Sequence, residues 1–340
     1  MRRSLLEALV CPHCGAAPLR CPGEGDVEDG EVSCPAGHVL TVRRGVLDAL
    51  PSTTADIAGQ LAEQARERGG SIEPDQVEKY TKNISAIGSK TYNELIRDNA
   101  ASVLDAISVK GGRSLDLGGG SGWLSGQLAG RGFEAVSLDI QDPLERTRQI
   151  EEGAARRGFE LVTDVAPELA DVSVDFVLGD MERLPFADGT FDLVTTSAAL
   201  HHSDDPSRTL KEAARVLKAD GVLLCINEPV KGLFRDEEPI MGGRGDDAGE
   251  HIYWARTYLD WIHAAGFKTR LHFPGWVDKR LRQGDWEGVV YYKRLLPVIR
   301  AIWMLPGVRA LVGGPLLRPS QDLFGLTLIV EARKVAGSSN

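Results

Sequence analysis

A glycine-rich turn carries the residues best suited to binding a nucleotide. The segment SLDLGGGSGWL places three alternating glycines, Gly118, Gly120 and Gly122, after Asp116. Glycines let the backbone approach a ligand that side chains would exclude. A dinucleotide fingerprint needs G-x-G-x-x-G, but the position three after Gly120 is Trp123. The acid and the glycine spacing therefore indicate a nucleotide-type site that does not match the dinucleotide pattern.

Two further acids follow the next two apolar segments. The segment AVSLDIQD ends near Asp139, where a carboxylate can accept hydrogen bonds from both hydroxyls of a ribose. Ile140 follows it, and we include it among the cofactor residues. Further along, Asp180 could bind an adenine amine, and Met181 offers an apolar face to the ring. These positions predict a nucleoside site that begins at the glycine turn.

Cysteines and a histidine near the N-terminus have the spacing of metal ligands. The pairs are Cys11 with Cys14 in a C-x-x-C knuckle, and Cys34 with His38. Together they make a Cys₃His set suited to tetrahedral zinc. Cys21 could replace His38 to give a Cys₄ site. Four protein ligands leave no open position, so we expect structural zinc.

Alternating strands and helices must position these residues. We expect a Rossmann-like, doubly wound α/β domain with a mainly parallel seven-stranded sheet, preceded by a small zinc ribbon. The predicted strands are Ser114–Leu117, Ala135–Leu138, Val174–Leu178, Leu193–Thr196, Val222–Ile226, Thr269–Phe273 and Leu326–Glu331. The predicted helices include Gly122–Ala129, Pro143–Ala155, Pro206–Leu217 and Tyr258–Ala265.

The chain divides into four predicted parts. We expect the zinc ribbon over residues 1–50 and a linker over 51–79. The catalytic domain would occupy 80–274 and 323–335, and 275–322 would be an insertion that serves as a cap or an interface. A polar, Gly-rich stretch, Pro229–Glu250, has the composition of a substrate loop.

Residues 105–270 closely resemble the class I S-adenosylmethionine methyltransferases, especially the ubiquinone/menaquinone C-methyltransferase branch. The motifs that carry the resemblance are LDLGGGSGW, SLDIQD, GDMERLPF and FDLVTTSAALHH, in that order. The resemblance implies that the turn from Asp116 to Gly122 holds the methionine end of S-adenosylmethionine. It also implies that Asp139 holds the ribose, that Asp180 and Met181 frame the adenine, and that Ser197 lies beside the methyl group.

Two histidines after the fourth predicted strand are the candidates for a catalytic base. His201 and His202 lie where the resemblance places the acceptor, and histidine has a suitable unperturbed pKa. A base is needed when the acceptor must lose a proton, as a hydroxyl usually must. The alternative is that His201 is a loop or capping residue. Glu228 is a second candidate for contact with the acceptor.

The N-terminal segment resembles two kinds of zinc ribbon. LLEALVCPHCGAAPL is similar to small zinc-ribbon proteins that activate methyltransferases, and GHVLTVRRGVLDALP to the ribbon fused to ribosomal RNA guanine-N1 methyltransferases. Acidic residues outnumber basic ones in this segment, which is unfavourable for binding phosphates. We therefore expect a scaffold or a wall of the acceptor site.

We expect a methyl acceptor that is a small molecule, such as a sugar or a secondary-metabolite intermediate of natural product biosynthesis, methylated at oxygen or nitrogen. An rRNA or tRNA base is one alternative, although the formal net charge of −10 disfavours nucleic acid. Another is a lipid or quinone acceptor at a membrane surface, suggested by the cationic, apolar stretch 294–318. The acceptor atom and the oligomeric state, including a homodimer, stay open.

Composition indicates a globular protein of the cytoplasm. The chain has 340 residues, of which 42% are hydrophobic and 26% charged. Its N-terminal apolar run is interrupted by Glu7 and lacks a cleavage site, so we expect no secretory signal. No uncharged apolar stretch reaches the roughly 20 residues that span a bilayer.

Overall fold

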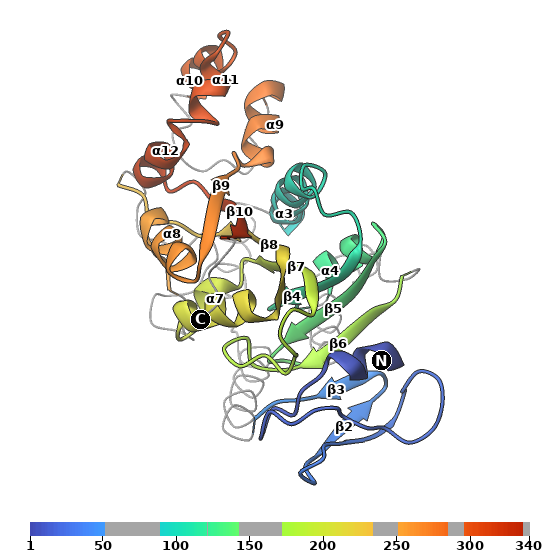
Figure 1. Cartoon of the computed structure of the whole chain (residues 1–340). Helices are drawn as coiled ribbons and strands as arrows, with labels where there is room; N and C mark the ends of the chain where they lie inside the picture. Colours follow the sequence, from blue (N-terminus) through green and yellow to red (C-terminus); the bar gives the residue numbers. More distant parts are fainter. Residues whose placement is uncertain (52–88, 121, 143–171, 234–250, 285–295, 336–340) are drawn as a thin grey trace, which may run out of the picture.

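A ten-stranded sheet crosses the protein (Figure 1). The computed structural model describes residues 1–51, 89–120, 122–142, 172–233, 251–284 and 296–335. The strands are β1 (Gly30–Ser33), β2 (Val39–Arg43), β3 (Val46–Asp48), β4 (Gly112–Leu117), β5 (Phe133–Asp139), β6 (Val174–Leu178), β7 (Phe191–Ser197), β8 (Leu217–Glu228), β9 (Phe267–Leu271) and β10 (Leu328–Lys334).

Helices lie between most of these strands. The 3-10 helices are η1 (Arg3–Ala8) and η3 (Leu200–His202). The α-helices are α3 (Ser89–Leu104), α4 (Trp123–Ala129), α7 (Pro206–Val216), α8 (Ala255–Ala264), α9 (Gly275–Gln283), α10 (Leu296–Trp303), α11 (Val308–Val312) and α12 (Leu317–Phe324). Among the described residues, none of the helices has both the length and the apolar character needed to cross a membrane.

The strand order confirms a mainly parallel α/β sheet. It runs β1-β2-β3-β6-β5-β4-β7-β8-β10-β9. From β3 through β8 each neighbouring pair is parallel, whereas β10 is antiparallel to both β8 and β9. Seven of these strands are the seven that the sequence predicts, with ends shifted by a few residues. The other three belong to the N-terminal segment, and their joining the same sheet was not predicted.

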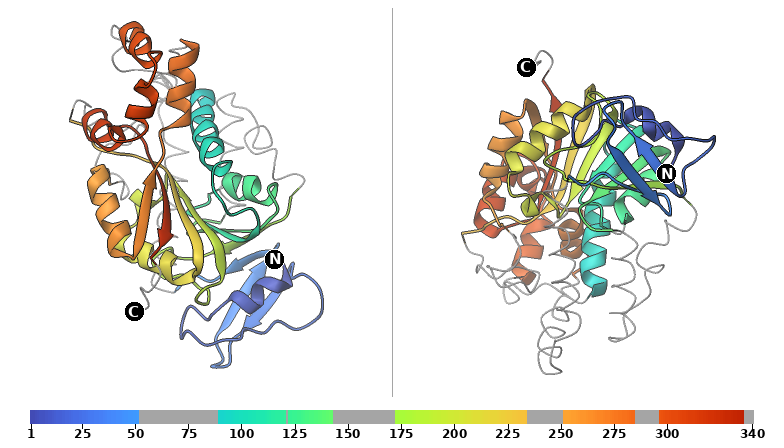
Figure 2. Two further views of the ribbon diagram at one scale, coloured as in Figure 1. Left: turned by 45° about the horizontal axis from the view of Figure 1, so that its top comes forward. Right: turned by 90° about the horizontal axis from the view of Figure 1, so that it is seen from below.

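Both faces of the sheet are buried, which explains the apolar runs in its strands. In β8, Leu223 and Cys225 pack into a cluster that also contains residues of α7 and α8. The alternate residues Leu224 and Ile226 pack into a second cluster with residues of α3 and α4. Because side chains alternate along a strand, one apolar strand serves both layers. The two views in Figure 2 show helices on opposite faces of the sheet.

The N-terminal module continues the sheet of the catalytic part instead of standing apart. Its strand β3 pairs in parallel with β6, from Val46 opposite Phe176 to Asp48 opposite Leu178. Further hydrogen bonds run from the Val10 amide to the Pro185 carbonyl at 3.0 Å and from the Ala187 amide to the Ala8 carbonyl at 2.8 Å. Figure 1 shows the module, in blue, at the β6 edge.

Arg2 fastens this junction through a largely buried ion pair. Its backbone amide and its Nε donate to the two oxygens of Asp175, each at 2.7 Å, and Asp175 is on β6. A third hydrogen bond reaches the Ala135 carbonyl at 2.7 Å. The exposed side-chain fractions are 22% for Arg2 and 4% for Asp175. The Asp175 charge therefore depends on Arg2 for much of its compensation.

The local elements agree with the predicted ones where the structure describes them. The helix predicted at Pro206–Leu217 is α7, and Asp205 caps it by accepting from the Arg208 amide at 3.1 Å. The helix predicted at Pro143–Ala155 and the linker over 51–79 lie outside the described residues, apart from position 51. Most of Pro229–Glu250 also lies outside them. The domain boundaries stay predictions.

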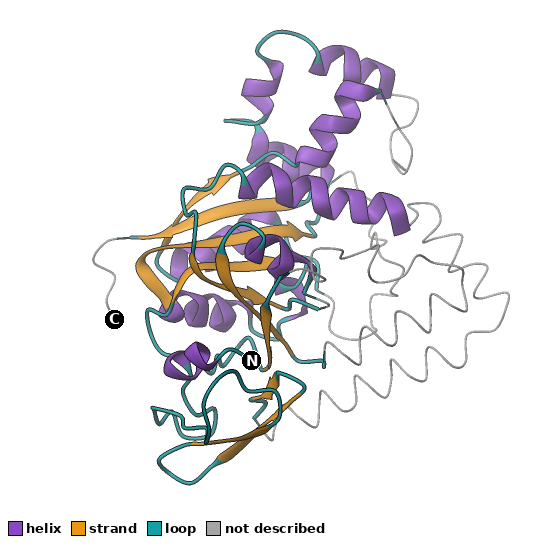
Figure 3. Cartoon of the chain, turned by 90° about the vertical axis from the view of Figure 1, so that its right-hand side faces the viewer, coloured by secondary structure: helices purple, strands orange, loops and turns teal. Residues whose placement is uncertain are grey.

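The described residues of the insertion predicted over 275–322 are mainly helical. They form α9, α10, α11 and most of α12, between β9 and β10. Figure 3 shows these helices at the end of the molecule opposite the N-terminal module. Their role as a cap or an interface is untested.

We predict that Arg2→Met destabilises the protein by about 2–3 kcal/mol, because it leaves the Asp175 carboxylate buried without its cation. Urea denaturation would measure this. The control is Arg131→Met, which breaks a pair with Asp105, whose side chain is 75% exposed, and should cost at most about 0.5 kcal/mol. Equal effects of the two substitutions would show that the Arg2 pair does not hold the junction.

Candidate functional site

The predicted site residues gather at one edge of the sheet. Asp116, Asp139 and Ser197 lie at the carboxyl ends of β4, β5 and β7, and Asp180 follows β6. Because these strands are parallel neighbours, their carboxyl ends meet at the same edge. In open α/β sheets this edge is where ligands bind.

The glycine turn packs tightly against neighbouring loops. The amides of Gly118 and Gly119 both donate to the Leu138 carbonyl, at 2.8 and 3.1 Å. Gly118 has φ of 66° and Gly120 has φ of 57°, in the left-handed region that favours glycine. A Cβ on Gly118 would lie 2.5 Å from the Cβ of Ala199, so a side chain there would displace the loop after β7.

Asp116 is buried beneath this turn and is 2% exposed. Its oxygens accept from the Thr195 hydroxyl at 2.8 Å and the Ser125 hydroxyl at 3.2 Å. Burial raises the pKa of the Asp116 carboxyl to about 7, although both hydrogen bonds act to lower it and the nearby Asp139 charge adds to the rise. A cation bound beside it would favour the ionised form.

Two backbone amides hold the Asp139 carboxylate in place. One carboxylate oxygen accepts from the Gly120 amide at 2.8 Å and the other from the Gln141 amide at 2.9 Å. A carboxylate has about four acceptor positions, so each oxygen can still accept a ligand hydroxyl. Ile140 follows at the same rim, and both residues are half-buried.

Asp180 and Met181 lie in the loop after β6. One oxygen of Asp180 accepts from the Glu182 amide at 2.8 Å, which fixes the turn. A Cβ on Gly118 would lie 3.6 Å from the Met181 Cε, so Met181 is adjacent to the glycine turn. Both residues are half-buried. The arrangement places an acid and an apolar side chain beside the turn.

Glu228, at the end of β8, is fully buried and is surrounded by donors. Its carboxylate accepts from the amides of Ala199 at 3.2 Å and Leu200 at 3.1 Å, and from the Thr196 hydroxyl at 3.3 Å. It also faces the Nδ1 of His201 at 2.9 Å. Burial acts to raise its pKa, but the His201 hydrogen bond and charge and the backbone donors outweigh it and hold the pKa below the usual value.

This contact fixes the tautomer of the neutral His201 ring. Because an ionised carboxylate accepts only, Nδ1–H donates to Glu228, and in the neutral ring Nε2 is then the acceptor. His201 is 7% exposed and lies on η3, shortly after β7. The neighbouring His202 is exposed, and its ring centroid lies 4.0 Å from that of His201. The two predicted histidines are thus adjacent but differ in burial, and only for His201 does the structure describe a bond to Glu228.

Strained backbone flanks these groups. Ala198 and Asn227 have φ of 50° and 62°, which non-glycine residues rarely adopt. The Asn227 side chain donates to the Ser197 hydroxyl at 3.2 Å and accepts from the Asn99 amide group at 2.8 Å. Asn99 also accepts from the Trp276 backbone amide at 3.0 Å. A buried polar chain therefore connects α3 and α9 to the carboxyl ends of β7 and β8.

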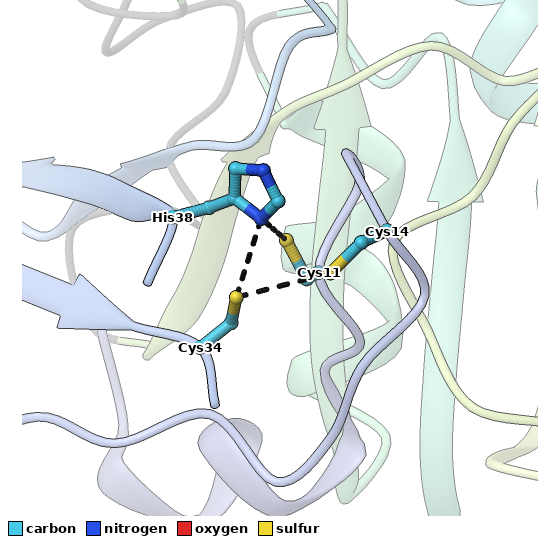
Figure 4. A group of neighbouring side chains, drawn as sticks. All are labelled: Cys11, Cys14, Cys34 and His38. Atoms are coloured by element: carbon cyan, nitrogen blue, oxygen red, sulfur yellow. Dashed lines mark hydrogen bonds between the residues drawn. The ribbon is translucent and has the colours of Figure 1, made fainter. Parts of the chain in front are cut away.

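The four predicted metal ligands converge in the N-terminal module (Figure 4). Their ligand atoms all lie within 4.8 Å of one another. The Sγ atoms of Cys14 and Cys34 are 3.8 Å apart, and the Nδ1 of His38 is 3.4 Å from the Cys34 Sγ and 3.6 Å from the Cys11 Sγ. Tetrahedral zinc, with bonds of about 2.0–2.3 Å, requires separations of about this size. Cys21 is not in this group.

Three features of the site are not predicted from the sequence. Glu228 is predicted to contact the acceptor but not to pair with His201, and neither Asn227 nor Asn99 is predicted to be a site residue. The segment INEP at the end of a strand was a signal for Asn227 and Glu228, since polar residues there face the ligand edge. No local pattern marked Asn99, because it is a single polar residue within an amphipathic helix.

Comparisons with known proteins agree with this geometry. A family model described as a methyltransferase domain matches residues 115–225. The demethylmenaquinone methyltransferase of Beutenbergia cavernae is 32% identical over 185 residues, which cover 51% of this chain and 69% of that protein. The ubiquinone/menaquinone biosynthesis C-methyltransferase UbiE of Ruegeria sp. is 36% identical, covering 48% and 68%.

Among solved structures, a complex of the Haloferax volcanii Trm112 methyltransferase activator with a methyltransferase matches with 19% identity. The match covers 79% of this chain and 100% of the other, with a TM-score of 0.45.

The glycine turn, the acids at the strand ends and the sequence relatives lead to one conclusion. The chain belongs to the class I S-adenosylmethionine-dependent methyltransferases.

Proposed function

We propose that the protein transfers a methyl group from S-adenosylmethionine to a small-molecule acceptor and that His201 is the general base. The observation that carries the proposal is the His201–Glu228 contact of 2.9 Å at the ligand edge of the sheet. A histidine oriented by a buried carboxylate is suited to accept a proton from an acceptor hydroxyl or amine. The acceptor class is a sugar or a secondary-metabolite intermediate, methylated at oxygen or nitrogen.

The residues around the glycine turn suit this cofactor. S-adenosylmethionine supplies, when bound, a methyl group on a positively charged sulfonium. The acids Asp116, Asp139 and Asp180 surround the turn and complement a cationic ligand. In this proposal the backbone at Gly118, Gly120 and Gly122 holds the methionine end, Asp139 and Ile140 hold the ribose, and Asp180 and Met181 hold the adenine. Ser197, positioned by Asn227, would lie beside the methyl group.

The chain's own contribution to the reaction is orientation and proton transfer. Holding the acceptor in line and close supplies much of the rate. The acceptor atom lies next to His201 Nε2, which takes its proton, and Glu228 stabilises the imidazolium that forms. Glu228 itself stays ionised, because its backbone donors stabilise the charged form.

A quinone acceptor is the second candidate. Its support is that relatives from Beutenbergia cavernae and Ruegeria sp. are named as methyltransferases of menaquinone or ubiquinone biosynthesis. A quinol ring must also lose a proton, so the same base would serve. The two candidates differ in the size and hydrophobicity of the acceptor and in the atom methylated.

We also propose that Cys11, Cys14, Cys34 and His38 bind structural zinc. The convergence of three thiols and an imidazole supports this, and four protein ligands leave no open position for catalysis. The module shares a core with the catalytic part, since Leu5 and Leu9 pack in one cluster with Phe186. Zinc in the module would therefore stabilise the adjacent β6 edge.

We predict that His201→Ala lowers kcat by about 10²–10⁴-fold, the usual contribution of a general base. The assay incubates the protein with S-adenosylmethionine and a panel of sugars, amines, phenols and quinols, and detects S-adenosylhomocysteine by mass spectrometry. Glu228→Gln should produce a similar loss, because its amide group would donate to Nδ1 and leave the proton on Nε2.

The matched control is His202→Ala, the exposed neighbour, which should keep turnover within about threefold. Binding of S-adenosylmethionine should be unchanged in both histidine variants. Wild-type turnover in His201→Ala would refute the base. Turnover of none of the panel, with intact cofactor binding, would count against the proposed acceptor classes.

We predict one zinc ion per chain, measured by inductively coupled plasma mass spectrometry. Cys34→Ser and His38→Ala should lose the metal and lower Tm, because the ligand set becomes incomplete. Cys21→Ser is the control and should retain it. The opposite pattern, with zinc lost in Cys21→Ser and kept in His38→Ala, would identify a Cys₄ site instead.

A further inference from the structure

Exposed apolar side chains concentrate on one helical segment. Of the ten large hydrophobic residues exposed in the described parts of the chain, eight lie within 298–324. We define these eight as the apolar cap surface: Val298, Ile302, Met304, Leu305, Leu311, Leu316, Leu323 and Phe324. A ninth, Leu233, is hydrogen-bonded through its amide to the Asp322 carbonyl of α12, at 2.9 Å. Large exposed apolar patches mark interaction sites, whereas apolar residues scattered singly over a surface do not.

One side of this helical segment is anchored to the rest of the protein, which leaves the exposed apolar residues on its other side. Trp303 of α10 is buried and stacks on Phe273, with ring centroids 4.8 Å apart. Its indole N–H donates to Asp278 of α9 at 3.0 Å, and Arg309 of α11 binds the same carboxylate at 2.8 Å. Val298 and Ile302 are about half exposed on the same helix as Trp303. Apart from Arg300, the exposed residues of α10 are apolar, unlike those on the polar face of an ordinary surface helix.

The positive charge of this segment favours an anionic membrane over a second copy of the chain as the partner that covers the surface. The segment 275–324 has eight Lys and Arg residues against four Asp and Glu, whereas the whole chain has 39 against 49. Arg300 and Arg318 are exposed among the apolar residues, and Arg309, which is paired with Asp278, is exposed beside them. Cationic and apolar groups together fit an interface of anionic headgroups and acyl chains. A second copy would bring the same positive charges against these, which is unfavourable.

The exposed turn between α10 and α11 is the part of this segment suited to insert into one leaflet of a bilayer. The turn Met304–Gly307 between α10 and α11 is exposed throughout, and Gly307 has φ of 83°. Figure 1 shows α10 and α11 at the end of the molecule farthest from the N-terminal module. The described helices include none that could span a bilayer, so any contact through them is peripheral.

We propose that the apolar cap surface docks the protein on an anionic lipid membrane. The docking does not depend on the methyl-transfer chemistry and is testable without an acceptor. It has a consequence for the site, because the Trp276 amide of α9 is linked through Asn99 to Asn227, beside Glu228. A docked cap therefore adjoins the carboxyl ends of β7 and β8, where an acceptor drawn from the lipid would arrive.

The test is flotation of the full chain with vesicles of phosphatidylcholine alone or with phosphatidylglycerol. We expect binding to the phosphatidylglycerol vesicles and release at about 1 M NaCl, where the Debye length falls to about 3 Å. The double variant Ile302→Asp with Leu305→Asp should lower the partition coefficient at least about tenfold, because two inserted side chains become charged. Val39→Asp, at an apolar residue 53% exposed on β2, is the matched control and should bind like wild type.

Unchanged Tm and cofactor binding would show that the double variant is folded. Failure of the wild-type protein to bind anionic vesicles, or equal binding by the double variant, would overturn the proposal. Light scattering gives a separate check. A wild-type dimer that the double variant converts to monomer would mean that the surface is a contact between copies of the chain.

Discussion

A single buried carboxylate organises the catalytic edge of this protein. Glu228 is fully buried, so its negative charge must be compensated within the fold. The amides of Ala199 and Leu200 and the Nδ1 of His201 do this, and all three groups belong to the loop after β7. The carboxylate thereby fixes the path of that loop and the tautomer of the neutral histidine. Removing it would disturb both His201 and the loop that packs against the glycine turn.

The same loop packs against the glycine turn, so the two halves of the proposed site are built together. Ala199 occupies the space that a side chain on Gly118 would need. Asn227 connects the end of β8 to Ser197 and, through Asn99, to α3 and the start of α9. The helical segment between β9 and β10 is thus connected to the site by hydrogen bonds between buried groups.

Sequence reasoning predicted the local elements well because the signals are local. Strands β4 and β8 are predicted from their own apolar runs, and the turn after Asp116 is predicted from its own glycines. The four predicted metal ligands are also recognisable from their spacing in the sequence. The Glu228–His201 contact joins residues 27 positions apart, and the Asn99–Asn227 bond joins residues 128 apart. The pairing of β3 with β6 was likewise not predicted, since neither strand carries a signal for its partner.

The most direct measurement is calorimetric titration of the protein with S-adenosylmethionine and, separately, with NAD. The account predicts micromolar binding of S-adenosylmethionine and none of NAD, since Trp123 replaces the third glycine of a dinucleotide turn. Asp139→Ala should abolish the binding, whereas Asp105→Ala, at an exposed residue, should not. Absence of S-adenosylmethionine binding by the folded wild-type protein would contradict the account.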